Sequence, residues 1–529
     1  MRSVLWSWPI WGITSLVLVG CAGPIRSAEN SWGERASHEL RARLRGDHIY
    51  VGGVGLAVAA SLSAFYLHRG DHPVWCTPSG PRVQADRLLQ ALLQARSDGL
   101  DPEEYYYSRI KTAIEAWRSP AGLLPDMAAI VELDLLLSNA FLLYGDHLQR
   151  GRIDPRRIHA HWQAPYVKGG LGSLLQTALD LNRIQEALDG LRPPQLGYAR
   201  LRAILMRYRA LAAAGGWPRV DGRGEGLESR LAASGDLEGG LSLVEGVEHF
   251  QRRHGLPASG HLDAETLMVL NRPIESVIAQ IELNMERWRW LPHAFDARYI
   301  LVRLDDYELD VVLEGKKERT SRVIVGKEYW RTPIFSAVMT HLVLNPYWYV
   351  PRSIAVGEIL PLLERDADYV HRNGFRVSVG QGAEVTAVDP AEIDWSRINA
   401  DEFPYHFAQV PGPTNPLGQV KFLFPNPHNI YVHDTPNHTL FEREKRAFSH
   451  GCIRVEDSVG LAAVLLDGWT RAQVETAVGS GQNRELALAR PLPVFMLYWT
   501  AWVGDDNVLQ LREDDYQSDA LMRRALSRK

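Results

Sequence analysis

The three cysteines of this chain differ in their surroundings, and one lies in a setting suited to chemistry. Cys21, Cys76 and Cys452 are odd in number, and their spacing fits neither a disulfide framework nor a zinc motif. Each cysteine therefore needs its own explanation. Cys452 closes the run Ser-His-Gly-Cys. A lone cysteine can be a buried structural thiol, but the polar residues before Cys452 favour a reactive one.

A reactive cysteine in this position could act as a nucleophile in acyl transfer. A free thiol titrates near pH 8.5, so a neighbouring base is needed to take its proton. His433 is the preferred base because it ends a predicted strand at residues 430–432, whereas the rivals His428 and His438 lie in loops with Pro and Asn. An imidazole can accept the thiol proton and later return it to a leaving amine.

The residues next to Cys452 could form the rest of the site. Ser449, His450 and Gly451 make up the expected active-site turn, in which backbone amides could face a developing oxyanion. Gly451 would let the backbone approach a substrate closely. Arg454 offers a planar guanidinium suited to a carboxylate. The four histidines of this stretch contain no HExxH pattern, so we expect no metal there.

Alternating apolar residues on both sides of an irregular segment predict the domain that holds these residues. Residues 298–350 and 418–470 alternate in the manner of antiparallel strands, broken by turns with Gly, and indicate a β-rich domain at 295–475. Between them, residues 351–418 are interpreted as an insertion with a helix near 354–363. An insertion of this size beside a catalytic strand is typical of a lid or cap.

The N-terminal half of the chain is predicted to be helical. Leucines recur at helical spacing in residues 83–95 and 133–148, within a helical region at 35–215. Residues 49–67 are uncharged and long enough to cross a membrane, but their Gly, Ala and Ser content favours a buried segment of the helical domain. Residues 485–529 form a C-terminal segment that we expect to pack on one of the larger domains.

Residues 220–273 are predicted to form a small separate domain. Phe250 and His254 share one face of a helix that Gly255 can end in the left-handed region, and Asp263 is placed to cap the next helix. The string VEHFQRRHGLPASGHLDAETLMVLN resembles the three-helix peptidoglycan-binding domain. The alternative is a generic helical hairpin.

The first 21 residues are typical of an export signal. An almost wholly apolar stretch follows Arg2 and is short for a membrane span. It ends in Leu-Val-Gly-Cys, which resembles a bacterial lipobox and makes Cys21 a candidate for lipidation. An ordinary signal peptide or a membrane anchor with a chance cysteine is the alternative. All three interpretations place the rest of the chain outside the cytoplasm.

The composition narrows the class of protein further. With 46% hydrophobic and 23% charged residues, the chain is predicted to fold rather than remain disordered. A net charge of -5 and the lack of a long basic run argue against a nucleic-acid partner. The length of 529 residues predicts about three or four domains.

The stretch from His433 to Arg454 resembles the signature of the L,D-transpeptidase catalytic domain: a histidine, about fifteen residues, then Ser-His-Gly-Cys and a polar residue two positions later. Similarity to the large periplasmic branch of that family extends to residues 323–335, 342–355, 372–377, 423–436 and 497–503. Members of that branch carry a helical scaffold domain, an inserted peptidoglycan-binding domain and a cap over the active site. The resemblance therefore implies a multidomain α+β protein in the periplasm of a Gram-negative-type bacterium.

The resemblance also implies roles for the site residues. Cys452 would be the nucleophile and His433 the general base, with His450 and Gly451 shaping the turn. Arg454 departs from the Asn usual at its position, so its role, and the group that orients His433, stay open. The implied reaction joins two peptidoglycan tetrapeptide stems through a thioester, releases D-alanine and needs no cofactor. Carbapenem-type β-lactams would be inhibitors.

Two rival functions remain at this point. An L,D-carboxypeptidase would use the same residues with water in place of the acceptor amine. A non-enzymatic wall-binding protein would carry a decayed site, although the intact His433 and Ser-His-Gly-Cys set argues against it.

Overall fold

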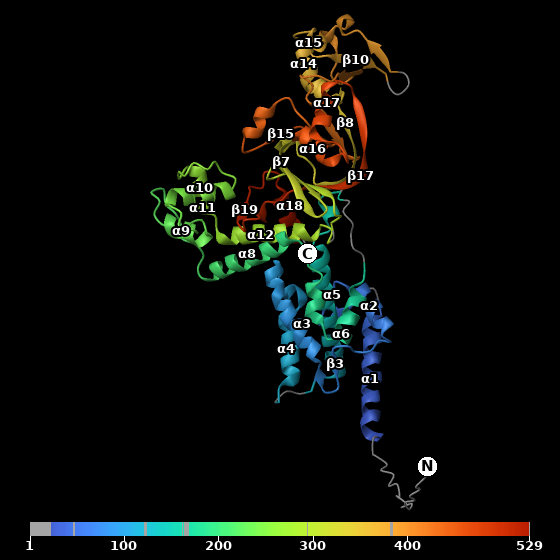
Figure 1. The fold of residues 1–529 in the computed structure, drawn as a ribbon. Helices are drawn as coiled ribbons and strands as arrows, with labels where there is room; N and C mark the ends of the chain where they lie inside the picture. The colour runs from blue at the N-terminus through green and yellow to red at the C-terminus, as the bar shows by residue number, and fades with distance from the viewer. Residues whose placement is uncertain are drawn as a thin grey trace, which may run out of the picture. The chain divides into compact units, whose positions relative to one another are not determined.

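The structure is a computed structural model that describes residues 23–527, apart from residues 46–47, 121–123, 161, 163–168, 294 and 381–384. The expected export signal and Cys21 lie outside the described residues. Contacts divide the chain into two compact units. The first is helical and the second holds every strand of the large sheet, which confirms the predicted multidomain α+β class (Figure 1).

The first unit takes in the described residues up to 94 together with residues 102–145 and 169–189. Its helices are α1 (Gly23–Leu44), α2 (Ala59–His68), α3 (Val83–Leu93), α4 (Tyr107–Arg118), α6 (Leu171–Asp180), α7 (Ile184–Asp189) and most of α5 (Met127–Arg150). The buried Asp134 of α5 accepts hydrogen bonds from the backbone amides of Val74, Trp75 and Cys76. Cys76 is itself 1% exposed, so it is a structural thiol.

Residues 49–67 form a short hairpin, β1 (Tyr50–Val51) with β2 (Val54–Gly55), followed by most of α2. Within the described part of the chain, only α5 is long and apolar enough to cross a membrane, and 72% of its most apolar window is buried in the protein. Burial of this kind is the ordinary condition of a core helix. A second hairpin joins β3 (Cys76–Thr77) to β4 (Gly80–Pro81).

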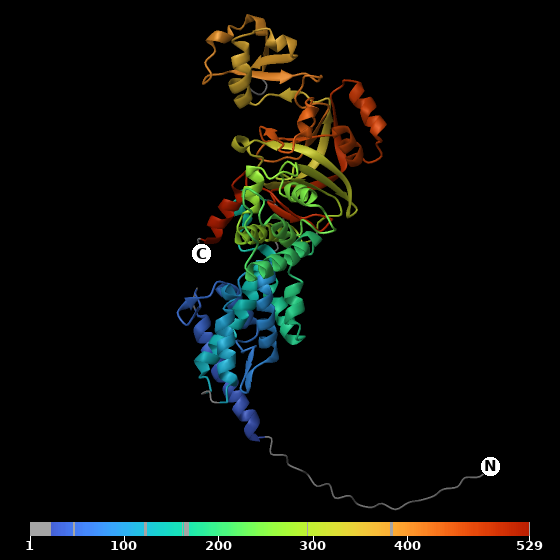
Figure 2. The same cartoon turned by 90° about the vertical axis from the view of Figure 1, so that its left-hand side faces the viewer.

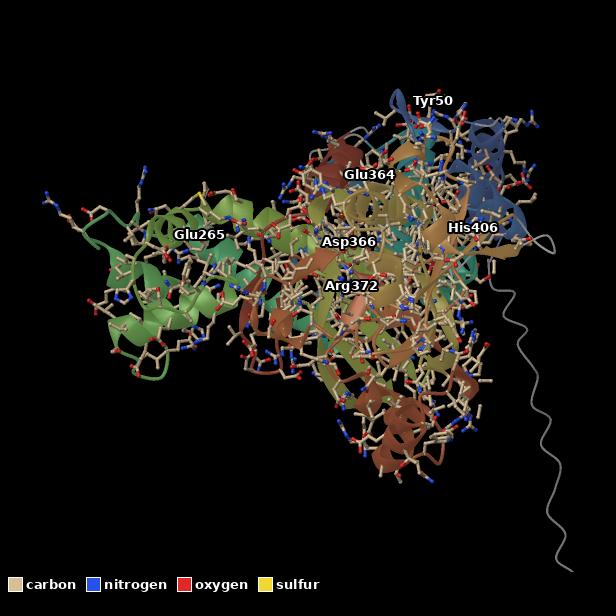
Figure 3. The ribbon with its side chains drawn as sticks, turned by 90° about the horizontal axis from the view of Figure 1, so that it is seen from above. Tyr50, Glu265, Glu364, Asp366, Arg372 and His406 are labelled. Carbon is tan, nitrogen blue, oxygen red and sulfur yellow. The ribbon has the colours of Figure 1, made fainter. Side chains whose placement is uncertain are left out.

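Three short helices of the second unit, α9 (Leu227–Ser234), α10 (Leu243–Arg253) and α11 (Ala264–Leu270), surround a core of their own. Ser242 and Glu245 form a capping box at the start of α10, and Gly255 follows that helix with a φ of 68°. The Asp263 side chain caps α11, as predicted, by accepting from the Thr266 amide. Figure 3 shows Glu265 at the start of α11.

Two longer helices, α8 (Leu196–Ala213) and α12 (Ile274–Arg289), connect this cluster to the sheet. Trp288 of α12 stacks on Trp499 with ring centroids 4.5 Å apart. The apolar core around Trp288 and Trp499 also includes residues of the C-terminal hairpin, β18 (Ala501–Val503) with β19 (Leu509–Leu511), and of the last helix, α18 (Ser518–Ser527).

The large sheet has nine strands in the order β15-β7-β16-β14-β13-β8-β17-β5-β6. These strands are β5 (Tyr299–Arg303), β6 (Glu308–Leu313), β7 (Lys316–Gly326), β8 (Phe335–Leu344), β13 (Val420–Leu423), β14 (Val432–His433), β15 (Ala447–Ser449), β16 (Ile453–Val455) and β17 (Arg484–Leu497). Helices α16 (Ser458–Leu465) and α17 (Arg471–Gly479) contribute Leu461 and Val474 to its core. Asp457 caps α16 by accepting from the Gly460 amide.

Strand β17 extends the sheet beyond the predicted boundary at residue 475. It pairs with β8 on one side and β5 on the other, so it lies inside the sheet rather than against it. Pro491 and Pro493 argue against a central strand, because proline donates no ladder hydrogen bond. The register of the β17–β8 pair shifts between Ala487 and Leu492, which leaves Pro491 outside the regular ladder, whereas Pro493 stays paired with Val338.

Residues 348–409 contain a separate four-stranded sheet in the order β11-β10-β12-β9. Its strands are β9 (Trp348–Tyr349), β10 (Phe375–Val379), β11 (Thr386–Val388) and β12 (Tyr405–Gln409), with short helices α13 (Arg352–Ile354), α14 (Leu360–Leu363) and α15 (Tyr369–Arg372). We call this segment the cap. Figure 2 shows it projecting from one end of the large sheet. Its own apolar core includes Trp395 and Phe407, and its surface carries an Asp366–Arg372 ion pair (Figure 3).

Candidate active site

Three neighbouring strands place charged side chains in one row across the large sheet. Lys421 of β13 pairs with His433 of β14, and His433 pairs with Arg454 of β16. Directly paired residues project from the same face of a sheet. The imidazole therefore lies between two cationic side chains, one on each neighbouring strand.

Cys452 belongs to the next row on that face. Cys452 precedes Arg454 by two residues, and Tyr431 precedes His433 by two. The side chains of Cys452 and Tyr431 therefore lie on the same face of the sheet as those of the first row. The Ile453 amide donates to the Tyr431 carbonyl at 3.1 Å, which continues the ladder to this position. The Cys452 side chain is half-buried, and its Sγ lies 3.9 Å from the Asn429 carbonyl oxygen. Lys421 Nζ lies 3.9 Å above the Tyr431 ring.

The turn before Cys452 is held by internal hydrogen bonds. The Ser449 hydroxyl donates to the Cys452 carbonyl at 2.6 Å and accepts from the Gly451 amide at 3.0 Å. Gly451 has a φ of 114°, a value that favours glycine. A Cβ added there would lie 3.3 Å from Ile430 Cδ1, so both conformation and space favour a residue without a side chain.

A second loop fastens this turn from outside. The buried Thr332 hydroxyl donates to the Gly451 carbonyl at 2.8 Å and accepts from the Gly326 amide at 2.9 Å. The Tyr516 hydroxyl, from the C-terminal segment, donates to the Gly326 carbonyl at 2.6 Å. The Lys327 amide donates to the Ser449 carbonyl at 3.0 Å. The backbone that presents Cys452 is therefore fixed by residues from three separate parts of the chain.

Burial keeps both reactive side chains neutral in the resting protein. Desolvation, with the neighbouring Arg454 charge as the second cause, lowers the pKa of His433 to about 3. Burial raises the pKa of the Cys452 thiol, and this effect is opposed by hydrogen bonding to Tyr431 and by the charges of Lys421 and Arg454. At neutral pH Cys452 is therefore a thiol and His433 a neutral imidazole that can accept a proton.

His433 is oriented by the main chain. Its Nδ1 lies 2.5 Å from the Asp434 carbonyl oxygen. A carbonyl oxygen can only accept, so Nδ1 carries the proton and the neutral ring has its basic nitrogen at Nε2. A neutral ring so oriented is equipped to act as a general base at Nε2.

Comparison with known proteins agrees with this geometry. Residues 297–474 match the L,D-transpeptidase catalytic domain, and residues 60–205 match a scaffold domain. Residues 297–474 form an L,D-transpeptidase catalytic domain. The chain is also 35% identical over 278 residues to a Haemophilus influenzae protein provisionally named an L,D-transpeptidase. That match covers 51% of this chain and 55% of the relative, so the chain spans about half the length of the curated relative it matches.

Within the L,D-transpeptidase domain, the two rival histidines have other neighbours. The His428 ring packs against Phe335 at 5.4 Å between centroids, and the His438 ring packs against Phe441 at 6.2 Å. The structure places only His433 in the strand register that includes Cys452 and Arg454. Among the residues that the structure describes, no group of three or more His, Cys, Asp or Glu side chains is arranged to hold a metal ion.

Arg454 occupies a position suited to an incoming anion. Burial lowers the pKa of this guanidinium, and the negative charge of an ionised Cys452 would raise it. Its Nε atom is buried and has no hydrogen-bond partner among the described residues. A half-buried cation of this kind gains stability when a carboxylate or oxyanion binds.

His450 connects the L,D-transpeptidase domain to the cap. Its Nε2 lies 2.6 Å from a carboxylate oxygen of Glu358, in the one-turn π-helix of the cap at Ala355–Ile359. Its ring also packs against Trp330, with centroids 4.3 Å apart. His450 therefore contacts both the cap and the loop between β7 and β8, which the sequence did not indicate.

Sequence reasoning missed four residues near Cys452 and its turn. Lys421 and Tyr431 are placed there by strand register, while Thr332 and Tyr516 reach the turn from distant segments. Tyr431, two residues before His433, could have been found from the alternation of a strand. The other three carry no local signal, because their contacts depend on tertiary structure.

Proposed function

We propose that this protein is an exported peptidoglycan L,D-transpeptidase that forms 3–3 cross-links between tetrapeptide stems through a cysteinyl thioester. The observation that carries the proposal is the placement of Cys452 and His433 on one face of neighbouring strands in an L,D-transpeptidase catalytic domain. The neutral imidazole and the rigid turn support a role in acyl transfer.

In the first step, Cys452 Sγ attacks the carbonyl carbon between residues three and four of a donor stem. The thiol proton moves to His433 Nε2, and the imidazolium then protonates the leaving amine of D-alanine. The Gly451 amide is already engaged by Ser449, so the Cys452 amide is the better candidate to stabilise the oxyanion. The C–N bond breaks and a thioester remains on Cys452.

In the second step, the side-chain amine of a second stem attacks the thioester carbonyl. His433 accepts the amine proton and returns it to the departing thiolate, which restores the resting thiol and neutral imidazole. Arg454 binds the donor by pairing with the carboxylate of D-alanine. This role would explain why the Arg454 guanidinium lies near the thiol without an acidic partner among the described residues. Neither step consumes a cofactor.

The remaining parts of the chain fit a protein that works on the cell wall. Residues 220–273 have a core of their own, as a peptidoglycan-binding domain requires. The cap contacts His450 through Glu358, which suits a role in excluding water while the thioester waits for an amine. We place the protein in the periplasm, anchored by a lipid on Cys21.

The test is to incubate purified protein with disaccharide-tetrapeptide and follow the products by mass spectrometry. Cross-linked dimer together with free D-alanine, both lost in Cys452→Ala, is the expected result. Tripeptide without dimer would identify an L,D-carboxypeptidase, and no turnover with intact binding to sacculi would identify a wall-binding protein. A carbapenem should add its mass once to the wild type and not to Cys452→Ala.

A further inference from the structure

Two exposed aromatic side chains stand next to the active-site turn without a role in the chemistry above. Tyr329 is 91% exposed and Trp330 is 49% exposed, in a 3-10 turn at Glu328–Trp330 between β7 and β8. No other large apolar side chain in the described part of the chain is more exposed than Tyr329. Exposed aromatic surface of this kind commonly marks a binding site. We call these two residues the aromatic rim.

The aromatic rim is fixed relative to the nucleophile. Trp330 packs on His450, two residues before Cys452, and its carbonyl oxygen lies so close to Gly326 that a Cβ there would come within 2.0 Å of it. Thr332, two residues later, donates to the Gly451 carbonyl. The Trp330 ring therefore cannot move away without disturbing the turn, and a ligand bound on it would stand at a defined distance from Sγ.

The length of a stem peptide matches that position. Three extended residues span about 10 Å, and they separate the carbonyl attacked by Cys452 from the sugar that carries the stem. Trp330 contacts a residue two positions from Cys452, so the aromatic rim lies within a similar reach. A stem seated with its third residue at the thiol, and running from there towards His450, would bring its sugar to Tyr329 and Trp330.

The chemistry of the aromatic rim also suits a sugar. A pyranose ring presents apolar C–H groups on its faces and hydroxyl groups around its edge, so it stacks on flat aromatic rings that keep a polar tip in water. Lys327 Nζ lies 5.7 Å from the centre of the Trp330 ring and offers a donor for those hydroxyl groups. Tyr329 contributes its own hydroxyl at the solvent side.

We propose that Tyr329 and Trp330 bind the sugar ring to which the donor stem is attached. This inference rests on the proposed function, because it assigns the substrate of the same site. The aromatic rim makes the enzyme act on stems that remain attached to glycan in preference to free stem peptides.

The experiment compares acylation of Cys452 by disaccharide-tetrapeptide and by the free tetrapeptide, followed by intact-protein mass spectrometry. The wild type should favour the glycosylated donor by about 10-fold in kcat/KM, the change that one good ring contact supplies. Tyr329→Ala and Trp330→Ala should reduce this ratio towards one, while Tyr329→Phe and Trp330→Phe should preserve most of it. Tyr50→Ala, at a 56% exposed tyrosine in the helical unit, is the matched control and should keep the wild-type ratio.

Equal rates for the two donors in the wild type, or an unchanged ratio in Tyr329→Ala, would overturn the inference. Tyr329→Ala is the more decisive variant because Trp330 also supports His450.

If neither donor acylates Cys452, the proposed function fails. Binding of the peptide-free disaccharide, measured by saturation-transfer NMR, then still decides the role of the aromatic rim. Loss of that NMR signal in Tyr329→Ala would support the sugar site. A doubled molecular mass that Tyr329→Ala returns to a single chain would assign the aromatic rim to self-association instead.

Discussion

Glu358 of the cap and His450 of the active-site turn are in contact, with a carboxylate oxygen 2.6 Å from Nε2. His450 lies two residues before Cys452, so the contact joins the cap to the backbone that presents the nucleophile. Nε2 has no partner in hydrogen-bond geometry among the described residues, and the Glu358 side chain is 51% exposed, so this contact contributes at most about 1 kcal/mol to holding the cap against the turn.

Glu358→Gln should therefore weaken the contact between the cap and the active-site turn without damaging the thiol. We expect kcat/KM for disaccharide-tetrapeptide to fall by up to about 5-fold, the equivalent of about 1 kcal/mol, and release of uncross-linked tripeptide to rise because water enters more easily. Product ratios by mass spectrometry measure this. Glu364→Gln, on the cap surface (Figure 3), is the control and should behave as the wild type. A Glu358 variant with an unchanged product ratio would show that the contact does not help to exclude water.

The reactivity of Cys452 should increase up to high pH. Burial raises its pKa, so the rate of iodoacetamide alkylation should reach its midpoint above pH 8.5, the ordinary value for a free thiol. Lys421→Ala should move the midpoint higher still, because the lysine charge favours the thiolate. Alkylation is followed by mass spectrometry across the pH range. A midpoint near pH 6 would reveal a preformed thiolate–imidazolium pair and contradict this account.

His433 should make the protein less stable as the pH falls. Its pKa of about 3 in the folded state lies below the ordinary value near 6.5, so between these two pH values the unfolded state binds the proton more readily than the folded state. Stability is then lost as the pH falls from 6.5 towards 3. His433→Gln removes this group, and the slope of unfolding free energy against pH should decrease by up to about 1.4 kcal/mol per unit in that window. Urea unfolding at several pH values provides the slopes, and identical slopes would contradict the assignment.

Thr332 should matter to both stability and activity although it touches no substrate. Thr332→Val keeps the shape but leaves the Gly326 amide and the Gly451 carbonyl without their partner, at a cost of about 1–3 kcal/mol. We expect a lower melting temperature and a loss of acylation rate. Thr332→Ser retains the hydroxyl and should recover most of both. Calorimetry and acylation kinetics on the two variants test this, and equal behaviour of Val and Ser would show that packing rather than hydrogen bonding is important.

The sequence predicted those parts of the fold that depend on local signals. The Leu pattern of α5, the Asp263 cap and the turn at Gly255 are set by neighbouring residues, and all three appear in the structure. Strand β17 was not placed in the sheet, because its pairing with β8 and β5 joins segments far apart in the sequence and no local pattern determines it.

The candidate site also combines residues that local sequence indicates with residues that only tertiary contacts bring into place. Cys452 and His433 could be proposed from residue type and spacing, since they lie in one continuous stretch. The Asp434 carbonyl that orients His433 has no sequence signal, because every residue carries a carbonyl. The position of Lys421 depends on the pairing of β13 with β14, and that of Glu358 depends on where the cap lies. Sequence spacing alone determines neither.

The hydrogen bond from Tyr516 to Gly326 has a consequence for the order in which the protein folds. Tyr516 holds the loop that carries Thr332, and Thr332 holds the Gly451 carbonyl next to Cys452. Strand β17 completes the sheet on which this loop rests. The turn that presents Cys452 is therefore not stable on its own, and it forms only when these distant segments have folded onto it.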